Sequence, residues 1–384
     1  MKVLRIILAM VFMFSGFVKA IDPMGLSYKI QEYLLSFGFI SLRDLSINIA
    51  VFLCAFELCL GLMLMCNIHK KLIAAITTFT SFIFLLITFL IYMDTYISIS
   101  NCGCFGEAIS MSNNITFFKN IFLFILAFIY MVCIIKEEFK SEKIEMRFNI
   151  KEENFLLNSK KFINTNAFNS TVCLILIFVL SCSIPAYSME YLPPFDFMEY
   201  DRGANLALNQ NFENKIFDKY DKDISKDVIT EDNEILFFVA KDMKYLSELD
   251  IKNIEKLNGL LKNTDIKTYI LTNSDISENE IFKKICLSAD EIFLKSFLRS
   301  NKGVVLINNG IIRAKWEMDH FPFSRLMITD DSEILYKGFW GNKKLLNSQD
   351  YLKVKYLIIL VIILILLYII KNRGCLYKKW KIFI

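Results

Sequence analysis

The chain has 384 residues, of which 55% are apolar and 36 are phenylalanine, and its mean hydropathy is positive. A protein that folds only in water is seldom this apolar, so the composition excludes a purely soluble globular domain. The formal net charge of +4 comes mostly from basic residues beside the apolar segments, which argues against nucleic-acid binding.

Six apolar segments are each long enough to cross the hydrocarbon core of a membrane as a helix. They are residues 4–22, 46–66, 72–93, 117–135, 169–187 and 354–370. We interpret the first as a membrane helix rather than a cleaved signal peptide, because no clear small-residue cleavage site follows it. The first four spans have short connections, which favours an antiparallel four-helix bundle over residues 1–135.

Basic residues are concentrated on one side of these spans. Lys70 and Lys71 separate the second and third spans, and seven basic residues lie between the fourth and fifth. The opposite side carries Lys29 and Arg43 in one loop. Because positive charge favours the cytoplasm, we expect a multi-pass protein of the bacterial inner membrane with both termini cytoplasmic. Residues 188–353 are then periplasmic.

The segments around the last two spans differ in composition. Residues 136–168 are charged, and they form either a helix on the inner membrane surface or a solvated linker. The fifth span, 169–187, carries the chain back across the membrane to the external domain. A basic cytoplasmic tail at 371–384 follows the last span.

The external domain at 188–353 has a mixed pattern of strands and helices. The predicted elements are a strand at 235–239, a helix at 243–263, a strand at 267–271, a helix that Asp275 or Ser277 caps and that runs through Leu287, and a hairpin at 304–316. Asn309 and Gly310 supply the positive φ angles that a tight hairpin turn needs. Helices that alternate with buried strands predict an α/β thioredoxin-like domain.

A Cys-Gly-Cys-Phe-Gly motif at residues 102–106 lies between the third and fourth spans, on the predicted external side. Disulfide chemistry is permitted in that compartment. A disulfide between Cys102 and Cys104 would be strained and easily reduced, as a transfer agent requires. The alternatives are pairing with other cysteines and a static disulfide that clamps the loop. We expect no metal site, because the two histidines lie on opposite predicted sides of the membrane.

Glu57 lies inside the second predicted span. A carboxylate in hydrocarbon is costly unless it faces the bundle and finds a partner, and Lys19 is the candidate partner. Glu57 then either handles protons or a quinone, or joins two helices through a hydrogen bond. Gly16 and Gly61 favour close helix packing.

The external domain lacks the dithiol of a redox-active thioredoxin. Such a domain carries Cys-x-x-Cys after its central strand, and residues 239–245 contain no cysteine. Cys286 stands alone on a predicted helix and is expected to be a core residue. We therefore expect this domain to be redox-inactive.

The motifs of residues 1–135 resemble the MauE branch of the DoxX-like membrane proteins. The matching segments are Ser-Gly-Phe-Val-Lys-Ala-Ile-Asp-Pro-Met-Gly at 15–25, Glu-Leu-x-Leu-Gly at 57–61, Asn-Cys-Gly-Cys-Phe-Gly at 101–106 and Thr-Phe-Phe-Lys-Asn at 116–120. The whole chain resembles a longer variant of the Bacteroidetes type, which adds a C-terminal thioredoxin-like domain. Lys302 stands where such variants usually have proline.

The resemblance implies a four-helix bundle plus an external thioredoxin-like domain between two further transmembrane helices. MauE is associated with methylamine utilisation and with disulfide formation in methylamine dehydrogenase, and DoxX relatives are linked to quinone and thiol metabolism. Carried over, Cys102 and Cys104 become the candidate dithiol, Glu57 the membrane carboxylate, and a quinone the candidate cofactor.

The function that this implies is assistance to the disulfide or redox maturation of exported proteins. The expected partners are membrane lipids and an exported substrate or periplasmic protein. The alternative is a non-enzymatic membrane anchor or assembly factor with a redox-inactive, protein-binding thioredoxin-like domain.

Overall fold

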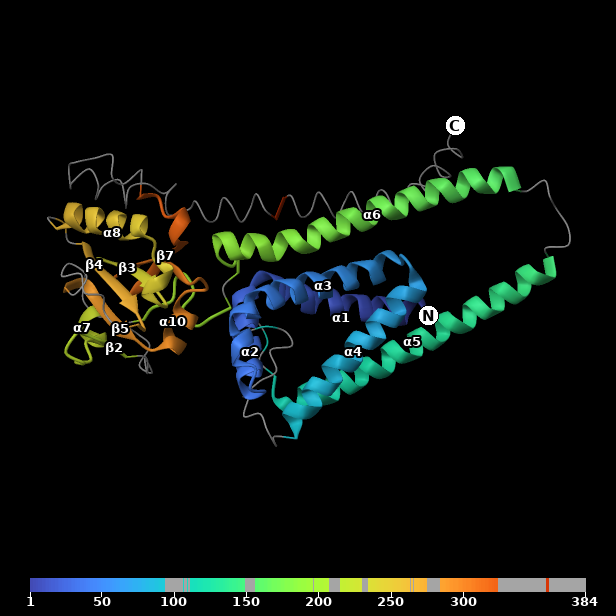
Figure 1. Ribbon diagram of the computed structural model, residues 1–384, viewed down its shortest axis with the longest axis horizontal. Helices are drawn as coiled ribbons and strands as arrows, with labels where there is room; N and C mark the ends of the chain where they lie inside the picture. The colour runs from blue at the N-terminus through green and yellow to red at the C-terminus, as the bar shows by residue number, and fades with distance from the viewer. Residues whose placement is uncertain are drawn as a thin grey trace. The chain divides into compact units, whose positions relative to one another are not determined.

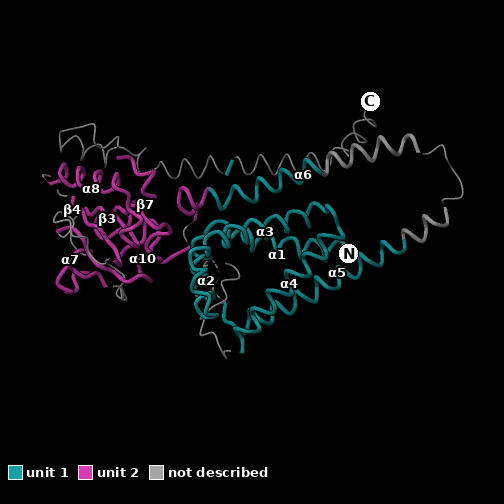
Figure 2. Tube along the Cα trace, viewed as in Figure 1, with its two compact units in different colours: residues 1–186, 356–384 teal, residues 187–355 magenta. Residues whose placement is uncertain are grey.

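The structure is a computed structural model that divides the chain into two compact units. These are residues 1–186 with 356–384, and residues 187–355 (Figure 2). It describes residues 1–93, 106, 109, 111–148, 156–195, 197–206, 215–229, 234–262, 264, 266–274, 284–323 and 357–358, without the side chains of 141–148, 156–170 and 227.

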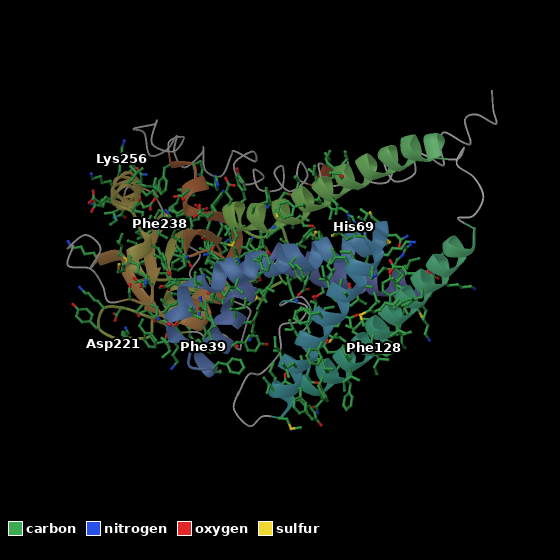
Figure 3. All side chains as sticks on the ribbon, turned by 45° about the vertical axis from the view of Figure 1, so that its right-hand side comes forward. Phe39, His69, Phe128, Asp221, Phe238 and Lys256 are labelled. Atoms are coloured by element: carbon green, nitrogen blue, oxygen red, sulfur yellow. The ribbon has the colours of Figure 1, made fainter. Side chains whose placement is uncertain are left out.

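The first unit is helical (Figure 1). Its helices are α1 (Lys2–Ile21), α2 (Pro23–Ser36), the 3-10 helix η1 (Ile40–Leu45), α3 (Ser46–Cys66), α4 (Lys70–Tyr92), α5 (Asn113–Phe148) and α6 (Leu156–Tyr191), the last of which ends in the second unit. Within the described part of the chain, five segments are long and apolar enough to cross a membrane: Lys2–Ile21, Ile40–Cys66, Lys70–Tyr92, Asn113–Lys140 and Thr171–Tyr191. Exposed aromatic side chains such as Phe128 point away from α5, as lipid contact requires (Figure 3).

These segments confirm the first five predicted spans to within a few residues. The sixth, at 354–370, and the tail at 371–384 lie outside the described residues apart from 357 and 358. Most of the charged segment 136–168 is helical, and its role as a surface helix or a linker stays a prediction. The helix α5 continues to Phe148 and α6 begins at Leu156. Pro185 lies inside α6, where it cannot donate a hydrogen bond to the carbonyl four residues earlier.

The segment that holds Lys29 and Arg43 was expected to be a loop, but Lys29 lies in α2 and Arg43 in η1. Asp22 caps α2, because its carboxylate accepts a hydrogen bond from the Gly25 amide at 2.9 Å. Pro23 occupies the first turn, where its missing donor costs nothing. The cap starts a new helix directly after α1 ends.

The second unit is a six-stranded mixed sheet with short helices. Its elements are β2 (Ile216–Phe217), α7 (Ser225–Ile229), β3 (Glu234–Ala240), η3 (Met243–Tyr245), α8 (Glu248–Leu261), β4 (Ile266–Thr272), β5 (Cys286–Ala289), α10 (Glu291–Phe297), β6 (Lys302–Asn308), β7 (Ile311–Glu317) and η4 (Met318–His320). The strand order is β2-β5-β4-β3-β6-β7, with β3, β4 and β5 parallel and the other pairs antiparallel.

Side chains of β3 alternate between two cores, as the two-residue period of a strand requires. Phe238 belongs to the core that α8 covers, together with Ile254 (Figure 3). Phe237 belongs to the core on the other face, where its ring meets the edge of Phe297 of α10 at a centroid distance of 6.1 Å. The sheet is therefore the middle of three layers.

The structure confirms the strands at 235–239 and 267–271 and the hairpin at 304–316, whose turn places Asn309 and Gly310 at φ values of 50° and 71°. The prediction of a helix through Leu287 is wrong, because Cys286 and Leu287 belong to the buried strand β5. Short apolar runs do not distinguish a strand from a buried helix. The expected caps, Asp275 and Ser277, lie outside the described residues.

Candidate functional site

Two glycines let α1 and α3 approach each other at backbone distance. A Cβ atom on Gly16 would lie 2.7 Å from the Cα of Leu58, and one on Gly61 would lie 2.9 Å from the Cα of Met13. Real side chains do not tolerate such contacts, so only glycine fits at either position. Small residues permit this close packing in membranes, and here they bring Glu57 against α1.

The Glu57 carboxylate is held at both oxygens by side chains of α1. Its Oε1 atom lies 2.5 Å from the Lys19 ammonium, and its Oε2 atom accepts a hydrogen bond of 2.7 Å from the Ser15 hydroxyl. Glu57 is 1% exposed, Lys19 5% and Ser15 8%. The prediction that Lys19 is the partner of Glu57 is confirmed. The Lys19 ammonium also lies 5.2 Å from the centre of the Phe84 ring, a distance typical of a cation–π contact.

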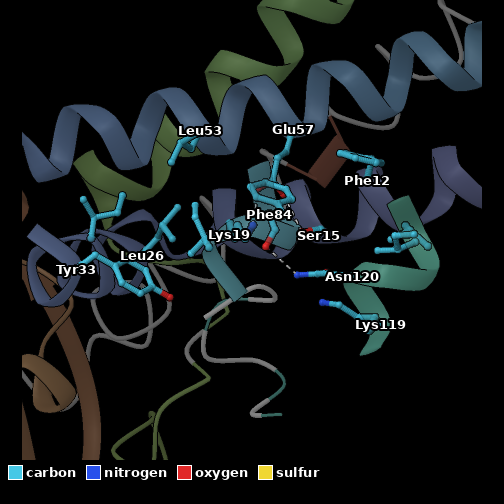
Figure 4. A pocket seen from close by; sticks show the side chains of 14 residues that line it. Phe12, Ser15, Lys19, Leu26, Tyr33, Leu53, Glu57, Phe84, Lys119 and Asn120 are labelled. Atoms are coloured by element: carbon cyan, nitrogen blue, oxygen red, sulfur yellow. Dashed lines mark hydrogen bonds and ion pairs between the residues drawn. The ribbon is translucent and has the colours of Figure 1, made fainter. Parts of the chain in front are cut away.

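A cavity of about 190 Å³ lies beside this ion pair (Figure 4). Five helices contribute to its wall. The lining residues are Val11, Phe12, Ser15, Lys19, Leu26, Ile30, Tyr33, Leu53, Glu57, Phe84, Ile87, Lys119, Asn120 and Leu123. The volume is more than ten times the ~10–15 Å³ that one water molecule needs on a comparable measure. The cavity is therefore large enough for a small organic group.

Asn120 fixes the wall that α5 contributes. Its amide nitrogen donates to the Thr88 hydroxyl at 3.2 Å and to the Phe84 carbonyl at 3.5 Å, so α4 and α5 are joined at this point. Lys119 precedes it on α5, and Figure 4 shows the two side chains beside each other at the edge of the cavity.

The cysteine motif ends near the same cluster. Cys102 and Cys104 lie outside the described residues, but Gly106, the last residue of the motif, is described. Gly106 has φ +58°, a conformation that favours glycine, and a Cβ atom built on it would lie 3.8 Å from Val18 Cγ1. Val18 directly precedes Lys19 on α1.

The second unit has no described dithiol. Cys286 is buried in β5, and burial raises the pKa of its thiol to about 11, so the thiolate is scarce near neutral pH. Lys302, which stands where the longer MauE-like variants usually have proline, forms ion pairs with two carboxylates, Asp250 at 3.0 Å and Asp319 at 2.7 Å. Burial alone would lower the pKa of Lys302, but the hydrogen bonds to Asp319 and Asp250 outweigh it and raise that pKa.

Sequence reasoning missed Ser15, Lys119 and Asn120 as members of the site. Lys119 could have been found by the same signal that marks Glu57, a charged residue within an apolar segment. Ser15 and Asn120 are uncharged and lack that signal, but both lie in the motifs at 15–25 and 116–120 that resemble MauE. Within the described part of the chain, no group of three metal-binding side chains is present.

Residues 1–133 match the family model described as methylamine utilisation protein MauE. No curated protein and no solved structure matches the chain. Every residue that lines the cavity, and the cysteine motif, falls within the matched segment.

Proposed function

Because residues 1–133 are a MauE-like membrane domain, we propose that this multi-pass membrane protein assists the disulfide or redox maturation of exported proteins. Cys102 and Cys104 are the proposed dithiol. The observation that carries the proposal is the approach of Gly106 to Val18, next to the buried pair of Lys19 and Glu57. Gly106, the last residue of the motif, therefore lies near the residue that precedes Lys19 on α1.

Covalent geometry supports a short path between the thiols and this cluster. Two peptide units separate Cys104 from Gly106, so their Cα atoms lie within about 8 Å of each other. Thiol-disulfide exchange needs a thiolate to attack and a proton to return to the leaving sulfur. A carboxylate that lies close to the thiols can accept the first proton and give it back.

The proposed reaction is an exchange that conserves electrons. A disulfide between Cys102 and Cys104 is attacked by one thiolate of a reduced exported protein, which forms a mixed disulfide and releases one cysteine of the motif. The second substrate thiolate then breaks the mixed disulfide, so the substrate is oxidised and both motif cysteines are reduced. Exchange with the disulfide of another exported protein restores the motif.

Glu57 has the proposed role of proton carrier in this cycle. Its two carboxylate oxygens contact the Lys19 ammonium and the Ser15 hydroxyl, and a carboxyl group can accept and return a proton. A quinone, the cofactor linked to relatives of this family, carries oxygen atoms on opposite ends of a flat ring. The cavity has its charged groups at one end, which suits a quinone less well. The proposed thiol exchange uses no quinone.

The test is thiol trapping of Cys102 and Cys104 in living cells that express Glu57→Gln. We expect normal abundance with both cysteines shifted toward the reduced state, because a glutamine cannot take up the thiol proton. Glu32→Gln on α2 is the matched control, since that carboxylate is exposed and paired with Lys29. Fully oxidised cysteines in Glu57→Gln at normal abundance would show that Glu57 serves helix packing instead.

The proposal places the cysteine motif and the second unit in the periplasm. A reporter that is active only outside the cytoplasm should be active when fused after Asn347 and silent when fused after Lys143. Activity at Lys143 would reverse the topology and remove the motif from the oxidising compartment.

A second function, a membrane anchor or assembly factor with a redox-inactive thioredoxin-like binding domain, is supported by the second unit. Cys286 is buried, and Lys302 is held by Asp250 and Asp319. The full chain with Cys102→Ser and Cys104→Ser should then fail to reduce insulin. Turnover by that variant would assign redox activity to Cys286.

A further inference from the structure

The turn that joins α2 to α3 exposes large apolar side chains. Every residue from 35 to 45 is exposed, and the large apolar ones among them are Leu35, Phe37, Phe39, Ile40, Leu42 and Leu45. Phe39 is 54% exposed and Ile40 is 67% exposed. Apolar side chains gathered in this way are unfavourable in water, so they mark a surface that contacts a partner or a membrane.

Several backbone amides of this turn donate to nearby carbonyls of the chain itself. The Phe39 amide donates to the Leu34 carbonyl at 2.7 Å. The Gly38 amide donates to the Leu35 carbonyl at 3.0 Å, and Gly38 has φ +78°, so α2 ends in a glycine C-cap motif with two hydrogen bonds. The Leu42 amide then donates to the Phe39 carbonyl at 3.1 Å. These amides need no water, so the turn can lie where water is scarce.

The exposed turn is continuous with a membrane-spanning helix. The apolar segment Ile40–Cys66 has 27 residues, and α3 alone supplies 21 of them. About 20 helical residues already cross the hydrocarbon core, so η1 falls at its boundary. The helix α2 runs across the ends of α1 and α3 rather than along them, as a helix in the plane of a membrane surface does (Figure 1).

We propose that residues 35–45 are embedded in the boundary between the lipid head groups and the acyl chains, with Phe39 and Ile40 among the upper chains. Arg43 and Asp44 are the charged residues of this segment, and their charges cancel. The attraction is therefore to the apolar part of the leaflet rather than to anionic head groups. Lipid fits this surface better than a protein does, because the surface continues directly into α3. The proposal does not depend on the thiol chemistry or on which end of the bundle faces the periplasm.

The first test uses the full chain in phosphatidylcholine nanodiscs, with one residue at a time replaced by p-benzoylphenylalanine, a photoreactive analogue of phenylalanine. Phe39 is the test position, Phe128 on α5 is the lipid-facing reference, and Tyr220 is an exposed reference in the second unit. Mass spectrometry after irradiation measures the lipid adducts for each chain. We expect adducts at Phe39 to match those at Phe128 and to exceed those at Tyr220 roughly tenfold or more, because burial of a half-exposed aromatic ring favours lipid by about that factor. Equal yields at Phe39 and Tyr220 would overturn the proposal.

A second test measures the depth of the turn. In Phe39→Trp, the emission added over that of the native protein reports on this position. We expect lipids that carry bromine on the upper part of the acyl chain to quench the added emission more strongly than lipids that carry it at the chain end, because a boundary segment reaches only about 5–10 Å into the leaflet. Stronger quenching from the chain ends, or no quenching by either lipid, would overturn the proposed depth.

A final test separates lipid from a protein partner. The chain with p-benzoylphenylalanine in place of Phe39 is irradiated in living cells, and Ile40 is replaced in the same way as a second position of the same turn. We expect lipid adducts to dominate at both positions. Cross-links to another protein, or to a second copy of the chain, that exceed the lipid adducts would assign the surface to protein docking and overturn the proposal.

Discussion

Replacing Lys19 by methionine should destabilise the helical unit by about 4 kcal/mol at pH 7. The substitution removes the ammonium that lies 2.5 Å from Glu57 and leaves a buried carboxylate that keeps its hydrogen bond from Ser15. Breaking a buried ion pair at one partner typically costs about 3–5 kcal/mol.

The same reasoning predicts a recovery. The double variant Lys19→Met with Glu57→Gln should regain most of the lost stability, because neither buried charge remains.

The assay is equilibrium unfolding of the purified protein in mixed micelles titrated with dodecyl sulfate. Lys29→Met is the control, because its partner Glu32 is exposed and such a pair contributes below about 1 kcal/mol. A Lys19→Met variant within 1 kcal/mol of the native protein, or a double variant no more stable than the single one, would refute the reasoning.

Two further predictions concern the packing of α1 and the sheet unit. Gly16→Ala should lower the free energy of unfolding by about 1–3 kcal/mol in the same assay, because the new methyl group meets the backbone of α3. In Gly259→Ala the new methyl group in α8 meets nothing within 4 Å, so this variant should be more stable than the native protein by up to about 1 kcal/mol. Equal effects of the two substitutions would contradict this. Burial alone would raise the pKa of Asp250, but hydrogen bonds from Ser247 and Lys302 outweigh it and lower that pKa, so the protection of the α8 amides relative to unfolded peptide should decrease as the pH falls below about 4. An Asp250→Asn variant should lose this dependence, and unchanged protection in the native protein would disprove it.

The membrane spans could be predicted from the sequence because each is one long apolar run, which needs no knowledge of its neighbours. The pairing of Lys19 with Glu57 could be predicted for a related reason. A charge in hydrocarbon requires a partner, and the chain offers few candidates near that depth. The turn at Asn309 and Gly310 was predictable because its φ angles exclude most other residues.

The other features depend on tertiary structure. The helix α2 has no long apolar run, so its sequence signals are the capping Asp22 and the Pro23 that follows it. The segment at Cys286 is short and apolar, a pattern that suits a strand and a buried helix equally. The cavity needs side chains from five helices to converge, and no local pattern encodes their distances.

Pro185 interrupts the backbone hydrogen bonds of α6 at one point. It lies one residue before Ala186, the last residue of the first unit in this part of the chain. Inside a helix, proline leaves the carbonyl of the residue four positions earlier, here Ser181, without its usual backbone donor. A helix bends most easily where a backbone hydrogen bond is missing, so this turn is a point at which α6 can bend.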